Sequence, residues 1–403
     1  MKNKDDVVIV SGVRTPFSKF GGMLREIHST DLGVIVIKES LRRAGLKGED
    51  LDELYYGMCD QAEAALYDNV NARQALLRAG LPNTLVSLTI DRACCSSLCA
   101  VQLGRRAILL GEADTCMAVG AENMSNTPLL INNHRWGSGM KPLLVQDYLN
   151  PITYREYTPL GKDAGEIAIE YGISREEQDS WAVGSHRKWA RADKEGLFTD
   201  ELVPVEIPGK KGVSIMFAQD ELPRPNTTVE ALAKLKTIYG SPTVTAGNAP
   251  GLDAGATAVI IMRRSKAEAL GVKPLATIVS VASGASEPRR MAELPGFVIQ
   301  KALQRASLSI DDMKVIEINE AFAAVTLVST KILADRDEQK WRSLLERTNP
   351  NGGAIAIGHP VGASGGRILM NMMYELRRRG GGYGVAGICG GLAQGDAVVI
   401  RVD

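Results

Sequence analysis

The sequence of 403 residues has no net charge, because 47 Lys and Arg balance 47 Asp and Glu. This balance excludes the strong positive field that draws nucleic acid to a protein, so an anionic ligand must meet local basic residues. Long apolar runs are also missing: runs such as Ala258–Met262 are far shorter than the ~20 residues of a membrane-spanning helix. We therefore expect no nucleic-acid partner and no membrane association.

Targeting and disulfide signals are equally scarce. The apolar segment Val7–Val10 is too short for a secretory signal, and Arg401–Asp403 is not the peroxisomal tripeptide. Six cysteines, of which Cys94 and Cys95 are adjacent, do not make a disulfide framework in a chain of this length. These absences predict a cytoplasmic protein.

What the sequence does contain is an alternation of short β-branched segments with helical patterns, which predicts an α/β fold with mainly parallel sheets covered by helices. Strand Val7–Ser11, a helix from Asp31 to Ala44 and strand Leu54–Gly57 form the first such unit. Its residues recur 262 positions later, where Ile37, Leu41, Arg43, Ala44, Leu46, Asp50 and Leu51 correspond to Ile299, Leu303, Arg305, Ala306, Leu308, Asp312 and Met313. This repeat predicts two related halves.

Between the halves the composition changes, with more Trp, Asn, Pro and charge and a predicted helix over Arg175–Lys194. We therefore predict an N-terminal half over 1–124, an inserted domain over 125–241 and a C-terminal half over 242–403. Arg224, in the Pro-rich stretch 222–226 of the insert, either borders an anionic ligand or belongs to a solvated surface.

Cys94 follows the predicted strand Leu88–Ile90 and opens a helix that runs to about Leu110. An unperturbed thiol with a pKa of ~8.5 is only about 3% ionised at neutral pH, and a helix start favours the thiolate. Cys94 is thus either a nucleophile or a small buried hydrophobe, and Cys95 and Cys99 are weaker candidates. A zinc site on these three cysteines is not expected, because adjacent cysteines fit tetrahedral geometry poorly.

Three further segments contain reactive side chains. The glycine-rich segment 349–367 lets backbone approach a ligand closely, but it matches neither a phosphate loop nor a dinucleotide fingerprint. His359 at its centre is either a structural histidine or the base for a cysteine. Asn319 follows the predicted strand Val315–Ile318, and Cys389 lies on a turn after strand Gly384–Ile388.

Taken together, these segments resemble the thiolases, of the acetyl-CoA acyltransferase or acetoacetyl-CoA thiolase type. Cys94 in a Cys-x-Ser-x-Leu-x-Ala setting, Asn319-Glu-Ala-Phe, Gly358-His359-Pro and Cys389-x-Gly391 occur in the order and spacing of that family. The resemblance covers nearly the whole chain and includes the segments Val13–Phe17, Ala121–Ser125, Arg175–Asp179 and Thr243–Asn248.

The resemblance implies a thiolase fold: two βαβαβαββ halves packed in layers, with an inserted loop domain that contacts CoA and the acyl group. It implies CoA as a substrate, with no permanently bound cofactor and no metal. It also implies a homodimer or a dimer of dimers.

The resemblance further implies a role for each residue of the site. Cys94 is the nucleophile that becomes acylated, His359 takes its proton, and Cys389 moves the proton at the α-carbon. Asn319 holds a water that joins His359 in one oxyanion hole, and the backbone N–H groups of Cys94 and Gly391 form the other. Two holes suit Claisen chemistry, which develops negative charge on two different oxygens.

Several positions depart from the usual thiolase pattern. Pro159–Gly161 replaces a His-Met-Gly sequence, Gly165 replaces a Glu, Pro250 replaces a Ser expected near pantetheine, and Asp253–Ala256 replaces Asn-Asp-Gly-Ala. An additional polar stretch spans about 335–347. The residues expected to contact CoA or the acyl group are Leu160, Arg224, Ala249, Pro250, Gly251 and Phe322.

These departures predict an atypical acyl and pantetheine pocket that accepts a bulky, branched or aromatic 3-oxoacyl-CoA, such as benzoylsuccinyl-CoA, with a small accessory subunit as a candidate partner. Three alternatives stay open. The first is an ordinary short-chain acetoacetyl-CoA thiolase, and the second is a non-catalytic scaffold or acyl-CoA carrier. The third is a decarboxylating ketoacyl synthase, which would have a second active-site histidine in place of Cys389.

Overall fold

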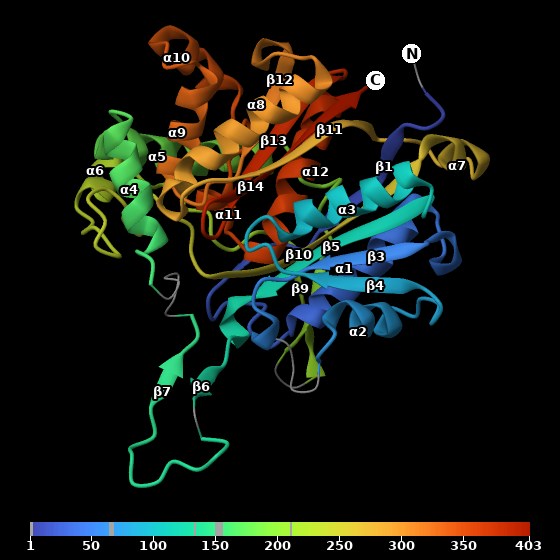
Figure 1. Ribbon diagram of the computed structural model, residues 1–403, viewed down its shortest axis with the longest axis horizontal. Coiled ribbons are helices and arrows are strands. Elements are labelled where there is room, and N and C mark those ends of the chain that lie inside the picture. The colour runs from blue at the N-terminus through green and yellow to red at the C-terminus, as the bar shows by residue number, and fades with distance from the viewer. Residues whose placement is uncertain (1–2, 64–67, 133, 150–155, 210–211) are drawn as a thin grey trace.

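The computed structural model of the protein describes residues 3–403 except 64–67, 133, 150–155 and 210–211 (Figure 1). The strands of its main sheet are β1 (Val7–Arg14), β2 (Ser18–Lys19), β3 (Glu53–Gly57), β4 (Val86–Ile90), β5 (Thr115–Asn123), β10 (Asp253–Arg263), β11 (Ala276–Ala285), β12 (Met313–Ile318), β13 (Gly382–Gly390) and β14 (Gln394–Val402). The helices outside the middle segment are α1 (Ser29–Ala44), α2 (Asn71–Arg78), α3 (Ser96–Leu110), α7 (Arg264–Ala269), α8 (Leu294–Ala306), α9 (Ala323–Leu333), α10 (Glu338–Arg347), α11 (Ala354–Ile357) and α12 (Ser364–Arg378).

Among the described residues, ten strands form one sheet in the order β12-β13-β14-β11-β1-β10-β5-β3-β4, with β2 paired to β10. The prediction of mainly parallel sheets is met only in part. Parallel pairs join β3 to β4 and β5, and β12 to β13, whereas β10 and β14 run antiparallel to their neighbours. The last strand of each half, β10 and β14, therefore runs antiparallel to its neighbours in the sheet.

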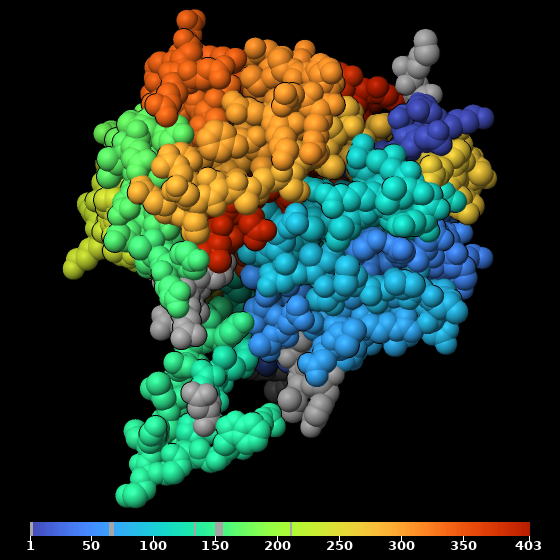
Figure 2. Space-filling model, in the orientation of Figure 1, coloured from blue at the N-terminus to red at the C-terminus, as the bar shows by residue number. Residues whose placement is uncertain are grey.

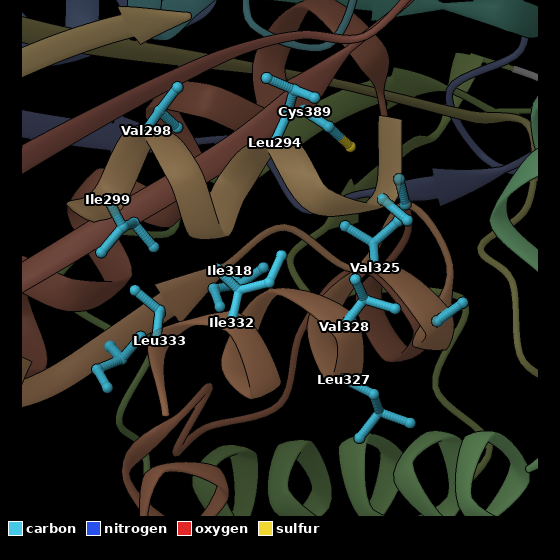
Figure 3. Close-up of a cluster of buried hydrophobic side chains, with 14 of the residues drawn as sticks. Leu294, Val298, Ile299, Ile318, Val325, Leu327, Val328, Ile332, Leu333 and Cys389 are labelled. Atoms are coloured by element: carbon cyan, nitrogen blue, oxygen red, sulfur yellow. The ribbon is translucent and has the colours of Figure 1, made fainter. Parts of the chain in front are cut away.

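The central strands are buried on both faces, which explains their nearly continuous apolar sequences. In β1, Val8 and Val10 pack into one core cluster with α1 and α2, while Val7 and Ile9 pack into another with α3 and α12. On the C-terminal half, α8 and α9 form a third cluster, which also contains Ile318 and Cys389 (Figure 3). Helices α3 and α12 thus occupy the inner layer, and α1, α2, α8 and α9 cover the outer faces.

The predicted repeat is present in the structure. Helix α1 connects β1 to β3, and α8 connects β11 to β12. After each helix an aspartate side chain accepts a backbone N–H three residues before it, from Lys47 to Asp50 at 2.8 Å and from Ser309 to Asp312 at 2.7 Å. The same short capped turn therefore follows the helix in both halves.

The middle segment contains the hairpin of β6 (Leu129–Ile131) and β7 (Val145–Asp147), which projects from the body of the molecule (Figures 1 and 2). Its other elements are α4 (Leu160–Glu170), α5 (Arg175–Lys194), β8 (Val205–Pro208), β9 (Ser214–Phe217) and α6 (Val229–Ala233). Beyond it, β10 pairs with β1 and β5, which are both strands of the N-terminal half. In the single ten-stranded sheet, β10 thus lies among strands of residues 1–124, although residues 242–403 were predicted as the C-terminal half.

Helix α3 is unusually apolar, and its position in the fold explains why. The stretch Ala93–Leu110 is long and apolar enough to cross a membrane by length and composition, but 61% of it is buried inside the protein. It packs against β3 and β5 and against α12. The apolar sequence of α3 is therefore that of a core helix.

Candidate active site

Cys94 lies on a sharp turn between β4 and α3, two residues before the first residue of that helix. Ala93 has a φ of +47°, which a non-glycine residue adopts rarely. The Asp91 carboxylate accepts the Ala93 N–H at 2.8 Å, and the Ser96 hydroxyl accepts the Arg92 N–H at 2.8 Å. Short polar side chains thus hold the turn that presents the half-buried Cys94.

His359 comes from the loop between α11 and α12, 265 residues away in the chain, and its Nε2 lies 3.1 Å from Cys94 Sγ. Gly358, directly before it, has a φ of +104°, which requires glycine. The loop is fixed at two backbone N–H groups by buried carboxyls, from His359 to Asp253 at 2.7 Å and from Gly362 to Glu122 at 2.6 Å. The predicted pair of cysteine and histidine is therefore brought together.

The hydrogen bonds around His359 define its tautomer. The Ser364 hydroxyl donates to the Pro360 carbonyl at 2.9 Å, so its oxygen is free to accept from His359 Nδ1 at 2.6 Å. The proton of the neutral ring therefore resides on Nδ1, and Nε2 is left with a lone pair that faces the Cys94 thiol.

The charge state of the pair is set by burial. Burial, and secondarily the Arg367 cation, lowers the pKa of His359 to about 3, so the ring is neutral. Burial, followed by the neighbouring Cys389 sulfur, raises the pKa of the Cys94 thiol well above its usual value. The helix start was expected to favour the thiolate, but desolvation is the largest influence on this thiol and its pKa is raised, not lowered. At rest the pair is a thiol hydrogen-bonded to an imidazole.

Asn319 lies beside the same ring. The fully buried Arg367 guanidinium donates to Asn319 Oδ1 at 2.9 Å, which directs Asn319 Nδ2 towards the His359 ring at 3.5 Å from Nδ1. Both of these nitrogens carry protons, so their contact is not a hydrogen bond. Arg367 in turn pairs with Glu317 at 3.5 Å. Asn319 therefore keeps its amide protons for another acceptor.

Cys389 is the penultimate residue of β13, so it lies within a strand and not on the turn that the sequence predicted. Its side chain is buried, and burial raises the pKa of its thiol to about 12. A Cβ on Gly390 would lie only 3.1 Å from Cys95 Sγ, so the turn containing Gly390 and the buried Gly391 packs on the segment that carries Cys94. Cys95 itself is fully buried, with Sγ 3.6 Å from the Ile388 carbonyl, so it occupies a structural position.

The six predicted CoA and acyl contacts fall into three groups. Ala249 and Phe322 belong to the core cluster that contains Cys389, and Leu160 packs against that cluster. Pro250 and Gly251 follow at the surface. Arg224 is exposed, and its backbone N–H donates to His186 Nδ1 at 3.2 Å. The first group therefore shares a core cluster with Cys389, whereas Arg224 lies at the surface, and the CoA contacts stay predictions.

Sequence reasoning assigned no role to Ser364, Arg367 or Asp253. All three lie near His359 in the fold, and Ser364 and Arg367 follow it by five and eight residues. The available signal was Arg367, because a charged residue within an otherwise apolar and glycine-rich segment must find partners in the core. Across the part of the chain that the structure describes, no group of three or more His, Cys, Asp or Glu residues is placed to hold a metal ion.

Comparisons with known proteins agree with this geometry. Residues 7–265 match the family model of the thiolase N-terminal domain, and residues 272–402 match that of the thiolase C-terminal domain. An acetyl-CoA acetyltransferase of Syntrophomonas wolfei is 43% identical over 98% of this chain and 99% of that protein. A beta-ketoadipyl-CoA thiolase of Pseudomonas aeruginosa is 38% identical over 98% of this chain and 99% of that protein.

Solved structures give the same result. Human mitochondrial 3-ketoacyl-CoA thiolase superposes with a TM-score of 0.93 at 37% identity, over 99% of both chains. Its complex with CoA superposes with a TM-score of 0.91 at 36% identity, over 99% of this chain and 98% of that chain. Family models of the thiolase N-terminal and C-terminal domains match the two parts of the chain, and the neutral His359 lies against Cys94 where the two halves meet. The chain therefore belongs to the thiolase family of acyltransferases.

Proposed function

We propose that the protein catalyses the CoA-dependent thiolysis of acetoacetyl-CoA, and the reverse condensation of two acetyl-CoA molecules, through an acyl group on Cys94. The observation that carries the proposal is the 3.1 Å contact between Cys94 Sγ and the unprotonated Nε2 of a neutral His359. The names of the relatives support the short-chain substrate, because the Syntrophomonas wolfei protein is an acetyl-CoA acetyltransferase.

In thiolysis, Cys94 Sγ attacks the 3-oxo carbon of the substrate while its proton moves to His359 Nε2. The bond between C2 and C3 then breaks, and the electron pair remains on the acetyl-CoA enolate. Cys389 donates its proton to that enolate, a role suited to a thiol that stays protonated at neutral pH. CoA then gives its thiol proton to the Cys389 thiolate and attacks the acyl carbon on Cys94. The bond from that carbon to Cys94 Sγ breaks, the second acetyl-CoA leaves, and His359 Nε2 returns its proton to Cys94 Sγ.

The two oxyanions need separate donors. Arg367 bonds only the Oδ1 atom of Asn319, so the amide protons on Nδ2 stay available. They can hold a water that donates to one of the two oxyanions. The backbone N–H groups of Cys94 and Gly391 suit the other, since the turn after β13 packs on the segment 92–95. Removal of one such donor typically lowers the rate by ~10²- to 10³-fold.

The predicted bulky or aromatic substrate is not part of this proposal, and the ordinary short-chain alternative replaces it. The relatives do not support a benzoylsuccinyl-CoA enzyme, and the packing gives a physical reason. A Cβ on Gly165 would overlap the Ser241 hydroxyl and lie 2.9 Å from Thr243 Oγ1, so other side chains already occupy the space beside that glycine. Leu160 is partly buried and packs against the core cluster. The accessory subunit was tied to the bulky substrate and is set aside with it.

The test is a comparison of kcat/KM for acetoacetyl-CoA with longer and aromatic 3-oxoacyl-CoA esters, using the purified chain alone. We expect acetoacetyl-CoA to be the best substrate, with a graded decline because each methylene changes binding by ~1 to 3 kcal/mol. A higher kcat/KM for an aromatic ester contradicts the proposal. If no ester is cleaved and mass spectrometry finds no acyl adduct on Cys94, the scaffold alternative is favoured.

We further propose a cytoplasmic homodimer or dimer of dimers. The six cysteines are all free thiols, which suits a reducing compartment. Strand β4 pairs only with β3 among the described strands, and it exposes Val86 and Leu88, so it is an apolar sheet edge of the kind that pairs with a second copy. The projecting hairpin exposes Leu129, Ile131 and Val145, which supports a further contact between dimers.

A further inference from the structure

Asp253 is a buried carboxyl directly behind the His359 loop. It is the first residue of β10 and is only 1% exposed. Its Oδ2 accepts the His359 backbone N–H at 2.7 Å, and a Cβ on Gly358 would lie 3.0 Å from the same carboxyl. The carboxyl therefore fills the space beside Gly358 and holds the backbone of the residue that faces Cys94.

The second oxygen of this carboxyl has no partner. Asp253 Oδ1 is buried, and no described residue offers it a hydrogen bond. Burial raises the pKa of Asp253 to about 7, although the His359 N–H acts in the opposite direction. An ionised oxygen without a donor is costly in such a place, whereas a protonated carboxyl keeps Oδ2 as the acceptor and puts its proton on Oδ1.

The charged groups on the elements around Asp253 do not neutralise it. On β2, Lys19 lies opposite Asp253 in the register but is exposed and pairs with Glu221 at 3.2 Å. On β5, Glu122 accepts the N–H groups of Gly362, Cys59 and Asp60, and burial raises the pKa of its carboxyl to about 7, so it brings no positive charge to Asp253. In the loop itself, His359 is neutral. Among the described residues no cation pairs with Asp253.

We propose that Asp253 is a positioning residue that, in its protonated form, holds His359 at the distance from Cys94 that proton transfer requires, and that loss of the Asp253 proton to solvent weakens this hold. An ionised Oδ1 must attract water or a new donor, and it can do so only if the turn at Gly358 opens. Proton transfer from Cys94 then becomes slower. The type of reaction follows from the proposed function, but the positioning of His359 does not depend on the substrate.

The test compares D253N and D253A with the wild-type chain. The amide of D253N keeps the shape and the acceptor for the His359 N–H but cannot ionise, whereas D253A removes the acceptor. The first readout is the rate of Cys94 alkylation by iodoacetamide, with the site located by mass spectrometry, from about pH 5.5 to about pH 9. This readout needs no CoA ester, so it is informative even if the proposed substrate is wrong.

We expect D253N to react as fast as wild type below about pH 6 and to become faster than wild type as the pH rises through about 7, because only the wild-type residue ionises. D253A should react roughly 10- to 100-fold more slowly at all these pH values. In steady-state thiolysis the same loss should appear in kcat and not in KM. Coincident pH profiles of wild type and D253N overturn the ionisation, and a wild-type rate in D253A overturns the positioning.

The thermal stability of D253N relative to wild type gives a second readout, which can be measured even if D253A fails to fold. A carboxyl whose pKa is raised on folding contributes stability that is fully present below its unfolded pKa of ~3.9 and is lost as the pH rises through its folded value. The amide of D253N cannot ionise, so this variant does not lose stability in this way as the pH rises. The difference in Tm between D253N and wild type should therefore grow with pH between about 4 and 7 and then level off. A constant difference overturns the proposal.

Discussion

At the scale of single residues, the chemistry depends on two groups that are both uncharged before substrate binds. The pKa of Cys94 is raised and that of His359 is lowered to about 3, so a thiolate–imidazolium pair is a minor state of the free enzyme. The proton therefore moves as the carbon–sulfur bond forms, with His359 acting as a general base. Ser364 contributes by holding the proton on Nδ1, which leaves Nε2 free for this transfer.

The first expectation concerns which cysteine carries the acyl group. Cys94→Ser should abolish turnover and acylation, because a hydroxyl is far less acidic than a thiol and His359 is a weak base. Cys95→Ala and Cys99→Ala should retain most of the activity, since both side chains are buried in packing positions. Peptide mass spectrometry after incubation with acetyl-CoA checks this, and an acyl group on Cys95 would refute the assignment.

The second expectation separates the two cysteines of the site. Cys389→Ala should still allow acylation of Cys94 by acetyl-CoA, since that step requires only Cys94, His359 and an oxyanion hole. It should block both thiolysis and condensation, because no group then moves the proton at the α-carbon. Cleavage of acetoacetyl-CoA at the wild-type rate would show that Cys389 has another role.

The chemically reactive residues could be found from the sequence, but the residues that position them could not. Cys94, His359, Asn319 and Cys389 lie in motifs with a family spacing, so their types and order sufficed. Ser364 and Asp253 matter because of hydrogen bonds to one particular ring nitrogen and one particular backbone N–H. Such bonds depend on three-dimensional placement. The sequence marked Asp253 only as the first residue of a departure from the usual Asn-Asp-Gly-Ala, and it gave no signal for Ser364.

At the scale of helices and strands, a helix whose sequence contains a clear capping motif is found where the sequence predicts it. Helix α5 has the predicted bounds Arg175–Lys194, because Ser174 and Glu177 form a capping box at its start. The polar stretch over 335–347 was not predicted as a helix, yet α10 forms there. Its apolar residues Trp341, Leu344 and Leu345 lie on one face, and their spacing was the only signal in a largely charged segment.

Trp341 is one of the two buried side chains of helix α10, and this leads to the third expectation. The indole is 1% exposed and its Nε1 donates to Thr330 Oγ1 of α9 at 2.9 Å. Trp341→Ala should lower the free energy of unfolding by about 3 to 5 kcal/mol, measured by urea denaturation, with kcat/KM little changed. The matched control is Arg342→Ala on the same helix, an exposed residue expected to cost less than about 1 kcal/mol. Equal stability of wild type and Trp341→Ala would show that α10 is not fixed by this side chain.

At the scale of the whole molecule, the site exists only where the two halves meet. Cys94 comes from the first half, and Asn319, His359 and Cys389 come from the second. The middle segment is fixed to the first half by the fully buried Arg14, which pairs with Glu201 and Asp220, each at 2.7 Å. The repeat predicted the two halves, but it did not predict that β10 pairs with strands of the first half after the insertion, because strand pairing over such a distance leaves no local pattern.

The free edge of the sheet provides the last expectation, which concerns assembly. Leu88 is 50% exposed on β4, where a second copy could continue the sheet. Leu88→Lys places a charge at this edge, and burying it across an interface should weaken self-association by at least about tenfold, since each 1.4 kcal/mol is a factor of ten. Analytical ultracentrifugation should then show a shift towards monomer. Leu270→Lys is the matched control, because Leu270 is also exposed, at 41%, but follows α7 away from the sheet edge. If Leu88→Lys sediments like the wild type, β4 is not the contact between copies, and the projecting β6–β7 hairpin becomes the next surface to mutate.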